Sequence, residues 1–143
     1  LAIQNDVQIV LLPLQYPADV AACKKLQQFM EQEAIILDAA FDTEQFLALM
    51  GNFSLLIGMR LHALIFAAVM EVPFIALSYD PKIDGFVKEI NGANIGAIEK
   101  FAADDLILAA QKTLEFENTG NERLVQLRTK ALENSQLAFE LLK

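Results

Sequence analysis

Short apolar runs that alternate with helical segments constrain the fold of this chain most. Residues 54–57 and 72–77 each form a run short enough for one buried strand. Between them, apolar residues recur at helical spacing from Leu61 to Val69. Strands that alternate with helices in this way form mostly parallel sheets with crossover connections. The pattern therefore predicts an α/β fold with a mostly parallel sheet and helices on both faces.

The same alternation extends along the rest of the chain. Strands are predicted at residues 7–12 and 34–37, and a short edge strand around Asn94. Helices are predicted at 18–31, 43–50, from Pro81 onward, 104–116 and 122–142. The helix at 18–31 should turn Leu26, Phe29 and Met30 toward the core. With 143 residues, the sequence predicts a single domain over 1–143 that ends in a C-terminal helix at 121–143.

Charge and hydropathy exclude several classes of partner. The net charge of -8 argues against a nucleic-acid ligand and against binding to an anionic membrane surface. The hydrophobic fraction is 55%, but the longest apolar run, 63–70, is far shorter than the roughly 20 residues of a membrane span. Buried parallel strands account for the high hydrophobic fraction. We therefore expect no membrane span and no nucleic-acid partner.

The cysteine and histidine content also limits the chemistry. One cysteine excludes an internal disulfide and is typical of a reducing compartment. A single histidine with scattered acidic residues does not provide metal-ligand spacing, so no metal site is predicted. No export signal is recognisable, which favours a cytoplasmic protein. Because the chain does not begin with methionine, we expect it to be part of a larger protein.

Potentially cationic side chains lie at two consecutive strand-to-helix junctions. Arg60 and His62 follow the strand at 54–57, and Lys82 follows the next strand. Asp80 before Pro81 is typical of a helix start, so Asp80 is assigned to capping. In open α/β sheets, ligands bind outside the carboxyl ends of the strands, and helix N-termini favour anions. The two junctions therefore predict a small-anion site that contains a proton donor, His62.

Four further residues are secondary candidates for this site. Gly58 and Tyr79 belong to the same two junctions, and Gln15 and Asp19 flank the first predicted strand-to-helix junction. Each candidate also has a structural interpretation. Arg60 and Lys82 could be solvated, His62 could be a hydrogen-bonded structural residue, and Asp19 could lie at a helix N-terminus. Cys23 is interpreted as a small core residue.

The segment 56–86 resembles the polysaccharide pyruvyl transferase family, bacterial enzymes that transfer an enolpyruvyl unit from phosphoenolpyruvate to a sugar of a surface-polymer precursor. The resemblance rests on Arg60-Leu61-His62 and Tyr79-Asp80-Pro81-Lys82, and it extends over residues 7–91. It implies a Rossmann-like domain that forms the C-terminal, donor-binding half of a GT-B-like two-domain enzyme. The missing N-terminal domain would be a partner of this chain, and we expect the chain alone to lack transferase activity.

The resemblance also implies a mechanism and a set of ligands. Arg60 and Lys82 would bind the phosphate and carboxylate of phosphoenolpyruvate, and His62 would be the catalytic acid. The product would be a pyruvate ketal on the acceptor, which is a sugar or a lipid-linked saccharide. Phosphoenolpyruvate is a substrate, so no cofactor is implied. Which residue delivers the proton to carbon remains open, because His62 could instead activate a hydroxyl of the acceptor.

Two other functional classes remain open at this point. A nucleotide-sugar-binding half of a GT-B glycosyltransferase or epimerase would use the same edge of the sheet. A non-catalytic flavodoxin-like interaction domain would share the fold but would leave Arg60, His62 and Lys82 without a role. The apolar stripe of the helix at 122–142 could pack on the missing half or form a homodimer of the chain.

Overall fold

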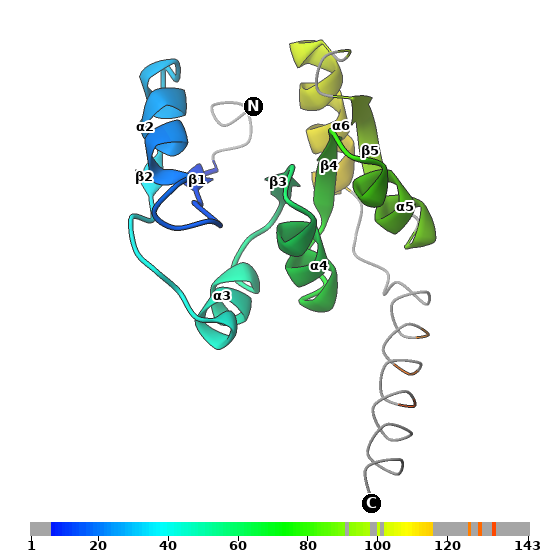
Figure 1. Cartoon of the computed structure of the whole chain (residues 1–143). Coiled ribbons are helices and arrows are strands. Elements are labelled where there is room, and N and C mark those ends of the chain that lie inside the picture. The colour runs from blue at the N-terminus through cyan, green and yellow to red at the C-terminus, as the bar shows by residue number, and fades with distance from the viewer. Residues whose placement is uncertain are drawn as a thin grey trace, which may run out of the picture. The chain divides into compact units, whose positions relative to one another are not determined.

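The computed structural model describes residues 7–90, 92–97, 100, 102–115, 126, 129 and 133. Within it the chain divides into two compact units, residues 1–49 and 50–143, and each unit is described by itself. Figure 1 labels the helices and strands of both units. The single domain expected over 1–143 stays a prediction of the sequence.

The first unit contains a pair of short parallel strands and a helix between them. Strand β1 (Val10–Leu11) pairs with β2 (Ile35–Ile36), and α2 (Val20–Gln28) connects them. Helix α3 (Thr43–Met50) follows and ends at the boundary between the units. Strands β1 and β2 are shorter than the predicted strands at 7–12 and 34–37, because only two residues of each apolar run pair with the neighbouring strand.

The apolar face of α2 differs from the prediction. Leu26 is 51% exposed and Phe29 is 77% exposed, whereas the sequence pattern placed both toward the core. Val20, in the first turn, is the buried residue of this helix. The helix ends at Gln28, so Phe29 is its C-cap and lies outside the periodic helical face. The expected packing of Leu26 and Phe29 in the core is therefore wrong.

The second unit contains a three-stranded parallel sheet with the order β3-β4-β5. The strands are β3 (Leu56–Gly58), β4 (Phe74–Ser78) and β5 (Ala93–Ala97). Helix α4 (Leu61–Val69) connects β3 to β4, α5 (Pro81–Glu89) connects β4 to β5, and α6 (Ala103–Glu115) follows β5. Figure 1 shows α4 and α5 in front of the sheet and α6 behind it. The α/β class, the parallel pairing and the strand near Asn94 are confirmed.

Strand β4 is the centre of the core because helices cover both of its faces. Ile75 and Ala76 are fully buried, as are Leu64 of α4 and Ala110 of α6. The rings of Phe74 and Phe86 stack with centroids 6.3 Å apart, which joins β4 to α5. Burial of each large apolar side chain contributes about 1.5–3 kcal/mol to stability. This packing therefore fixes the strand ends that precede Arg60 and Lys82.

Helix α4 ends in a left-handed residue that is not glycine, which its sequence does not predict. Glu71 has a φ of 59°, in the left-handed region that usually favours glycine. Its N–H donates to the carbonyl of Ala68 at 3.2 Å, and the N–H of Val72 donates to the carbonyl of Ala67 at 2.8 Å. This pair of bonds satisfies the last carbonyls of the helix and turns the chain directly into β4.

The predicted C-terminal helix at 121–143 lies largely outside the described residues. Of this segment only Gln126, Thr129 and Glu133 are described, and they are helical and exposed. The homodimer and the packing on a missing half, which depend on this helix, stay predictions. Across the described part of the chain, no helix is both long and apolar enough to cross a membrane.

Removal of the Asp80 side chain should destabilise the second unit. Its carboxylate accepts a hydrogen bond from the backbone N–H of Lys82 at 2.8 Å, which caps α5. We expect Asp80→Ala to lower the free energy of unfolding by about 0.5–2 kcal/mol. Asp80→Asn should retain most of the stability, because an amide oxygen also caps a helix. Urea denaturation measures both, and equal losses in the two variants would contradict a capping role.

Candidate functional site

Two strand-to-helix junctions lie at the same edge of the three-stranded sheet. Strands β3 and β4 are neighbours and parallel, with Gly58 opposite Ala76. Both strands therefore end at one edge, where α4 and α5 begin. The predicted adjacency of these two strands is confirmed. Arg60 and His62 reach this edge at the start of α4, and Lys82 reaches it at the start of α5.

The N-terminus of α4 combines a cation with a helix end that has no side-chain cap among the described residues. Arg60 is the N-cap residue, and its carbonyl accepts from the N–H groups of Ala63 and Leu64. Among the described residues, no side chain caps this helix, and its first turn contains no acidic residue. A guanidinium cannot accept a hydrogen bond, so the helix end and the Arg60 side chain both favour an anion.

His62 lies in the first turn of α4 and its side chain is exposed. In the described part of the chain, no hydrogen bond or ion pair of its imidazole is formed. A structural histidine is normally buried and hydrogen-bonded, whereas an imidazole that acts on a ligand must be accessible. The position of His62 therefore permits proton transfer to a bound ligand.

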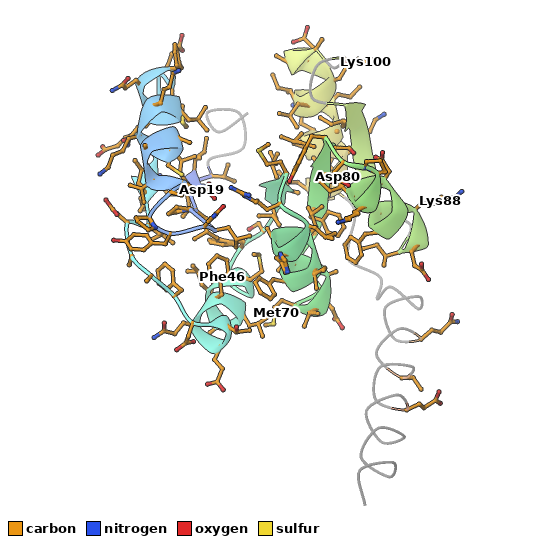
Figure 2. All side chains as sticks on the ribbon, in the orientation of Figure 1. Asp19, Phe46, Met70, Asp80, Lys88 and Lys100 are labelled. Carbon is orange, nitrogen blue, oxygen red and sulfur yellow. The ribbon has the colours of Figure 1, made fainter. Side chains whose placement is uncertain are left out.

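The N-terminus of α5 differs from that of α4. Asp80 caps it, as the sequence predicts, and Figure 2 shows Asp80 at the junction between β4 and α5. Because its carboxylate already satisfies the N–H of Lys82 and adds a negative charge, this helix end attracts an anion less than the sequence suggests. The side chain of Lys82 is exposed and forms no ion pair with the described residues. The Lys82 ammonium is therefore the cationic group that this junction offers to an anion.

The secondary candidates Gly58 and Tyr79 lie at the same edge. Gly58 is the last residue of β3, and a Cβ there would lie 3.4 Å from Cδ2 of Leu64. This is an ordinary van der Waals distance, so the packing of α4 does not by itself require glycine at this position. Tyr79 follows directly after β4 and is 58% exposed.

The junction also contains a residue that the sequence interpretation missed. Ser78, the last residue of β4, is buried and its hydroxyl lies 3.5 Å from the carbonyl oxygen of Asp80. The sequence signal for Ser78 was its position as a polar residue directly after the apolar run at 72–77. Ser78 supports the turn between β4 and α5.

Gln15 and Asp19 lie in the first unit, where they hydrogen-bond to each other. The carboxylate of Asp19 accepts from the N–H of Gln15 at 3.0 Å, and the N–H of Asp19 donates to the carbonyl of Gln15 at 2.9 Å. Asp19 is the N-cap residue of α2, although its side chain does not cap the helix. These bonds favour a structural role in the turn before α2. Figure 2 labels Asp19 there.

Cys23 lies one helical turn after Asp19 and is partly buried. Burial raises the pKa of the Cys23 thiol above its ordinary value, and the carboxylate of Asp19 raises it further. Both effects disfavour the thiolate, which is the nucleophilic form. This environment favours the structural interpretation of Cys23.

Removal of the Asp19 charge should make Cys23 more reactive. Because the carboxylate raises the thiol pKa, Asp19→Asn should lower that pKa and increase the thiolate fraction at pH 8. We expect alkylation by iodoacetamide to become faster, although burial still slows it. Cys23 is the only cysteine of the chain, so mass spectrometry reports on this thiol alone. Equal rates for both proteins would show that Asp19 does not influence the thiol.

The described residues contain no group of three or more His, Cys, Asp or Glu side chains that could hold a metal ion. The candidate site at the carboxyl ends of β3 and β4 therefore consists of cationic side chains and of the N-terminus of α4. We call this N-terminus the open end of α4, because no described side chain caps it. Such a site can bind a small anion through Arg60 and Lys82, with an imidazole beside it.

Comparison with known proteins identifies the family. Searches of curated proteins and of solved structures gave no match. The family model of polysaccharide pyruvyl transferases, however, matches residues 2–81 of the 143-residue chain. The match includes Arg60, His62 and Tyr79 and ends one residue before Lys82. Because it covers more than half of the chain, this protein belongs to the polysaccharide pyruvyl transferase family.

Proposed function

We propose that the second unit binds phosphoenolpyruvate and transfers its enolpyruvyl group to a sugar, on which a pyruvate ketal forms. Arg60 and Lys82 bind the anionic groups of the donor, and His62 is the catalytic acid. Family membership supports the transferase class. The observation that carries the site is the parallel pairing of β3 with β4, which brings the starts of α4 and α5 to one edge of the sheet.

The anionic donor suits this edge. Phosphoenolpyruvate carries a phosphate and a carboxylate on one enol carbon, so it needs cationic groups from two sides. Arg60 can donate two parallel hydrogen bonds to either group, and the open end of α4 adds backbone N–H donors. Lys82 contributes a point charge from the neighbouring junction. The global charge of -8 makes such a local group of cations necessary for attracting an anion.

The proposed reaction adds two sugar hydroxyls to the enol carbon. A proton added to the methylene carbon creates a methyl group and an oxocarbenium-like centre. Two C–O bonds to the sugar then form at this carbon, and the bond to the phosphate oxygen breaks. Of the two hydroxyl protons, one balances the proton gained by the methyl group and the other leaves with inorganic phosphate.

His62 participates in this sequence as a proton donor. Its exposed imidazole can donate a proton toward the leaving phosphate as negative charge develops there. Arg60 and Lys82 stabilise the same charge. The alternative in which His62 first accepts a proton from a sugar hydroxyl uses the same position and remains open.

The proposal extends to the architecture of the enzyme. The chain is the Rossmann-like, donor-binding half of a GT-B-like transferase, and a separate N-terminal domain provides most of the acceptor site. The acceptor is a sugar or a lipid-linked saccharide of a cell-wall polymer precursor. The reaction takes place in the cytoplasm, in agreement with the single cysteine of the chain. The chain alone has no transferase activity, because half of the site leaves the donor in water.

Thermal shift separates this function from its competitors. Phosphoenolpyruvate should stabilise the protein, by about 2.7 kcal/mol when its concentration is one hundred times the dissociation constant. Stabilisation by UDP alone would favour a nucleotide-sugar-binding half, and no response to either anion would favour a non-catalytic domain. NMR then locates the ligand, because phosphoenolpyruvate should shift the amide signals of residues 58–63 and 82–84. Shifts confined to the first unit would contradict the proposed site.

A further inference from the structure

Two large apolar side chains are exposed at the edge that carries the proposed donor site. Tyr79 is 58% exposed and Met59 is 45% exposed. Each lies one residue beyond the end of its strand and one residue before the N-cap of the following helix. Since β3 and β4 are paired and parallel, both side chains belong to the same edge of the sheet. Apolar surface therefore borders the cations of this edge.

The backbone around Tyr79 is held firmly, unlike that of an open loop. Ser78 before it is buried at the end of β4, and its hydroxyl lies 3.5 Å from the carbonyl oxygen of Asp80. After it, the carboxylate of Asp80 accepts from the N–H of Lys82, and Pro81 occupies the first position of α5. The aromatic ring is thus presented by an ordered turn, which lowers the entropic cost of contact with a ligand.

Phosphoenolpyruvate is too polar and too small to cover this surface. Its only apolar part is one methylene group, whereas Tyr79 and Met59 together expose an aromatic ring and a thioether chain. A hexose has faces of C–H groups that pack on an aromatic ring, and hydroxyls at its rim that can bond to the phenol group of tyrosine. In the proposed reaction, two sugar hydroxyls must also reach the enol carbon of the donor.

We propose that Tyr79 is a specificity-determining residue that packs against the hexose ring of the acceptor, with Met59 as an apolar neighbour at the same edge. This inference rests on the proposed function, because it assumes a donor bound by Arg60 and Lys82. The second unit thereby orients the acceptor, in addition to binding the donor. The aromatic ring is the essential feature, and the phenol group adds one hydrogen bond.

The tyrosine content of the chain allows a direct measurement. The sequence contains no tryptophan and two tyrosines, Tyr16 and Tyr79. In a Tyr16→Phe variant, Tyr79 is therefore the only strong fluorophore, and its emission reports on its own surroundings. We expect its emission to change when methyl glucoside, methyl galactoside or methyl mannoside is added in the presence of phosphoenolpyruvate. Tyr79→Phe, with Tyr16 intact, is the matched control.

Saturation-transfer NMR on the same glycosides tests the role of the ring. We expect Tyr79→Phe to retain the transfer to the sugar C–H protons, and Tyr79→Ala to weaken glycoside binding roughly two- to tenfold. Unchanged binding by Tyr79→Ala would overturn the inference. So would emission that responds to UDP but to no glycoside, because that response would identify a nucleobase as the occupant of the ring.

Titration of the unaltered protein with phosphoenolpyruvate distinguishes failure of the proposed Tyr79 role from failure of the proposed donor site. Amide shifts at residues 58–63 without any glycoside response would overturn the role of Tyr79 and leave the proposed donor site intact. No shift with phosphoenolpyruvate would contradict the proposed function itself, whatever the glycosides do.

Discussion

Replacement of His62 by alanine should lower the turnover of the complete transferase by about 10²–10⁴-fold, the usual contribution of a general acid or base. In the proposed mechanism the imidazole donates a proton in the transition state, so its loss should reduce kcat more than it raises the KM for phosphoenolpyruvate. Because His62 is exposed and no other described residue hydrogen-bonds to its side chain, the substitution should leave the fold intact. Phosphate release under saturating donor and acceptor measures the effect.

A matched set of variants separates proton transfer from other roles of His62. His62→Gln retains a polar side chain of similar reach but cannot donate a proton in the same way, so it should be nearly as inactive as His62→Ala. Lys88→Ala removes an exposed cation at the far end of α5 and should retain full activity (Figure 2). A His62→Ala enzyme with near-normal kcat would demote the histidine to a structural or binding residue.

The regions around β4 could be predicted from the sequence because local signals and tertiary structure agree there. Asp80 before Pro81 marks the start of α5, and the capping hydrogen bond to Lys82 is formed as expected. The apolar run at 72–77 predicted a buried strand, and Ile75 and Ala76 are indeed buried. Parallel pairing of β3 with β4 follows from the helix between them.

Other features could not be predicted, because they depend on contacts that one segment does not encode. The spacing of Leu26 and Phe29 shows that α2 has an apolar face, but it does not show what covers that face, and both residues are exposed. The left-handed conformation of Glu71 is imposed by the bonds that end α4, and glycine would have been the usual signal. The N-termini of α4 and α5 differ in local charge because the Asp80 carboxylate caps α5. This difference could be recognised only from the capping hydrogen bond in the structure.

This difference between α4 and α5 predicts unequal contributions of the two cations to donor binding. Arg60 lies at a helix end that no described side chain caps, whereas Lys82 lies beside the Asp80 carboxylate, which reduces the local positive potential. Arg60 is also the less exposed of the two, so its hydrogen bonds to an anion are less weakened by water and salt. We therefore expect Arg60 to contribute more than Lys82.

Arg60→Ala should weaken the binding of phosphoenolpyruvate roughly tenfold to a hundredfold, the usual range for loss of hydrogen bonds between charged groups. Lys82→Ala should have a smaller effect, comparable with loss of a solvated point charge. Arg60→Lys should recover only part of the loss, because an ammonium group cannot provide the planar pair of donors that a carboxylate or phosphate accepts. Isothermal titration with phosphoenolpyruvate measures all three dissociation constants.

The backbone role of Arg60 does not interfere with this comparison. The bonds that begin α4 run from the N–H groups of Ala63 and Leu64 to the carbonyl of Arg60, and any residue at this position can form them. Circular dichroism should therefore show equal helix content in Arg60→Ala, Arg60→Lys and the unaltered protein, and Lys88→Ala should bind the donor normally. If Lys82→Ala weakens binding more than Arg60→Ala, the donor is bound mainly at the start of α5, and the open end of α4 is not the centre of the anion site.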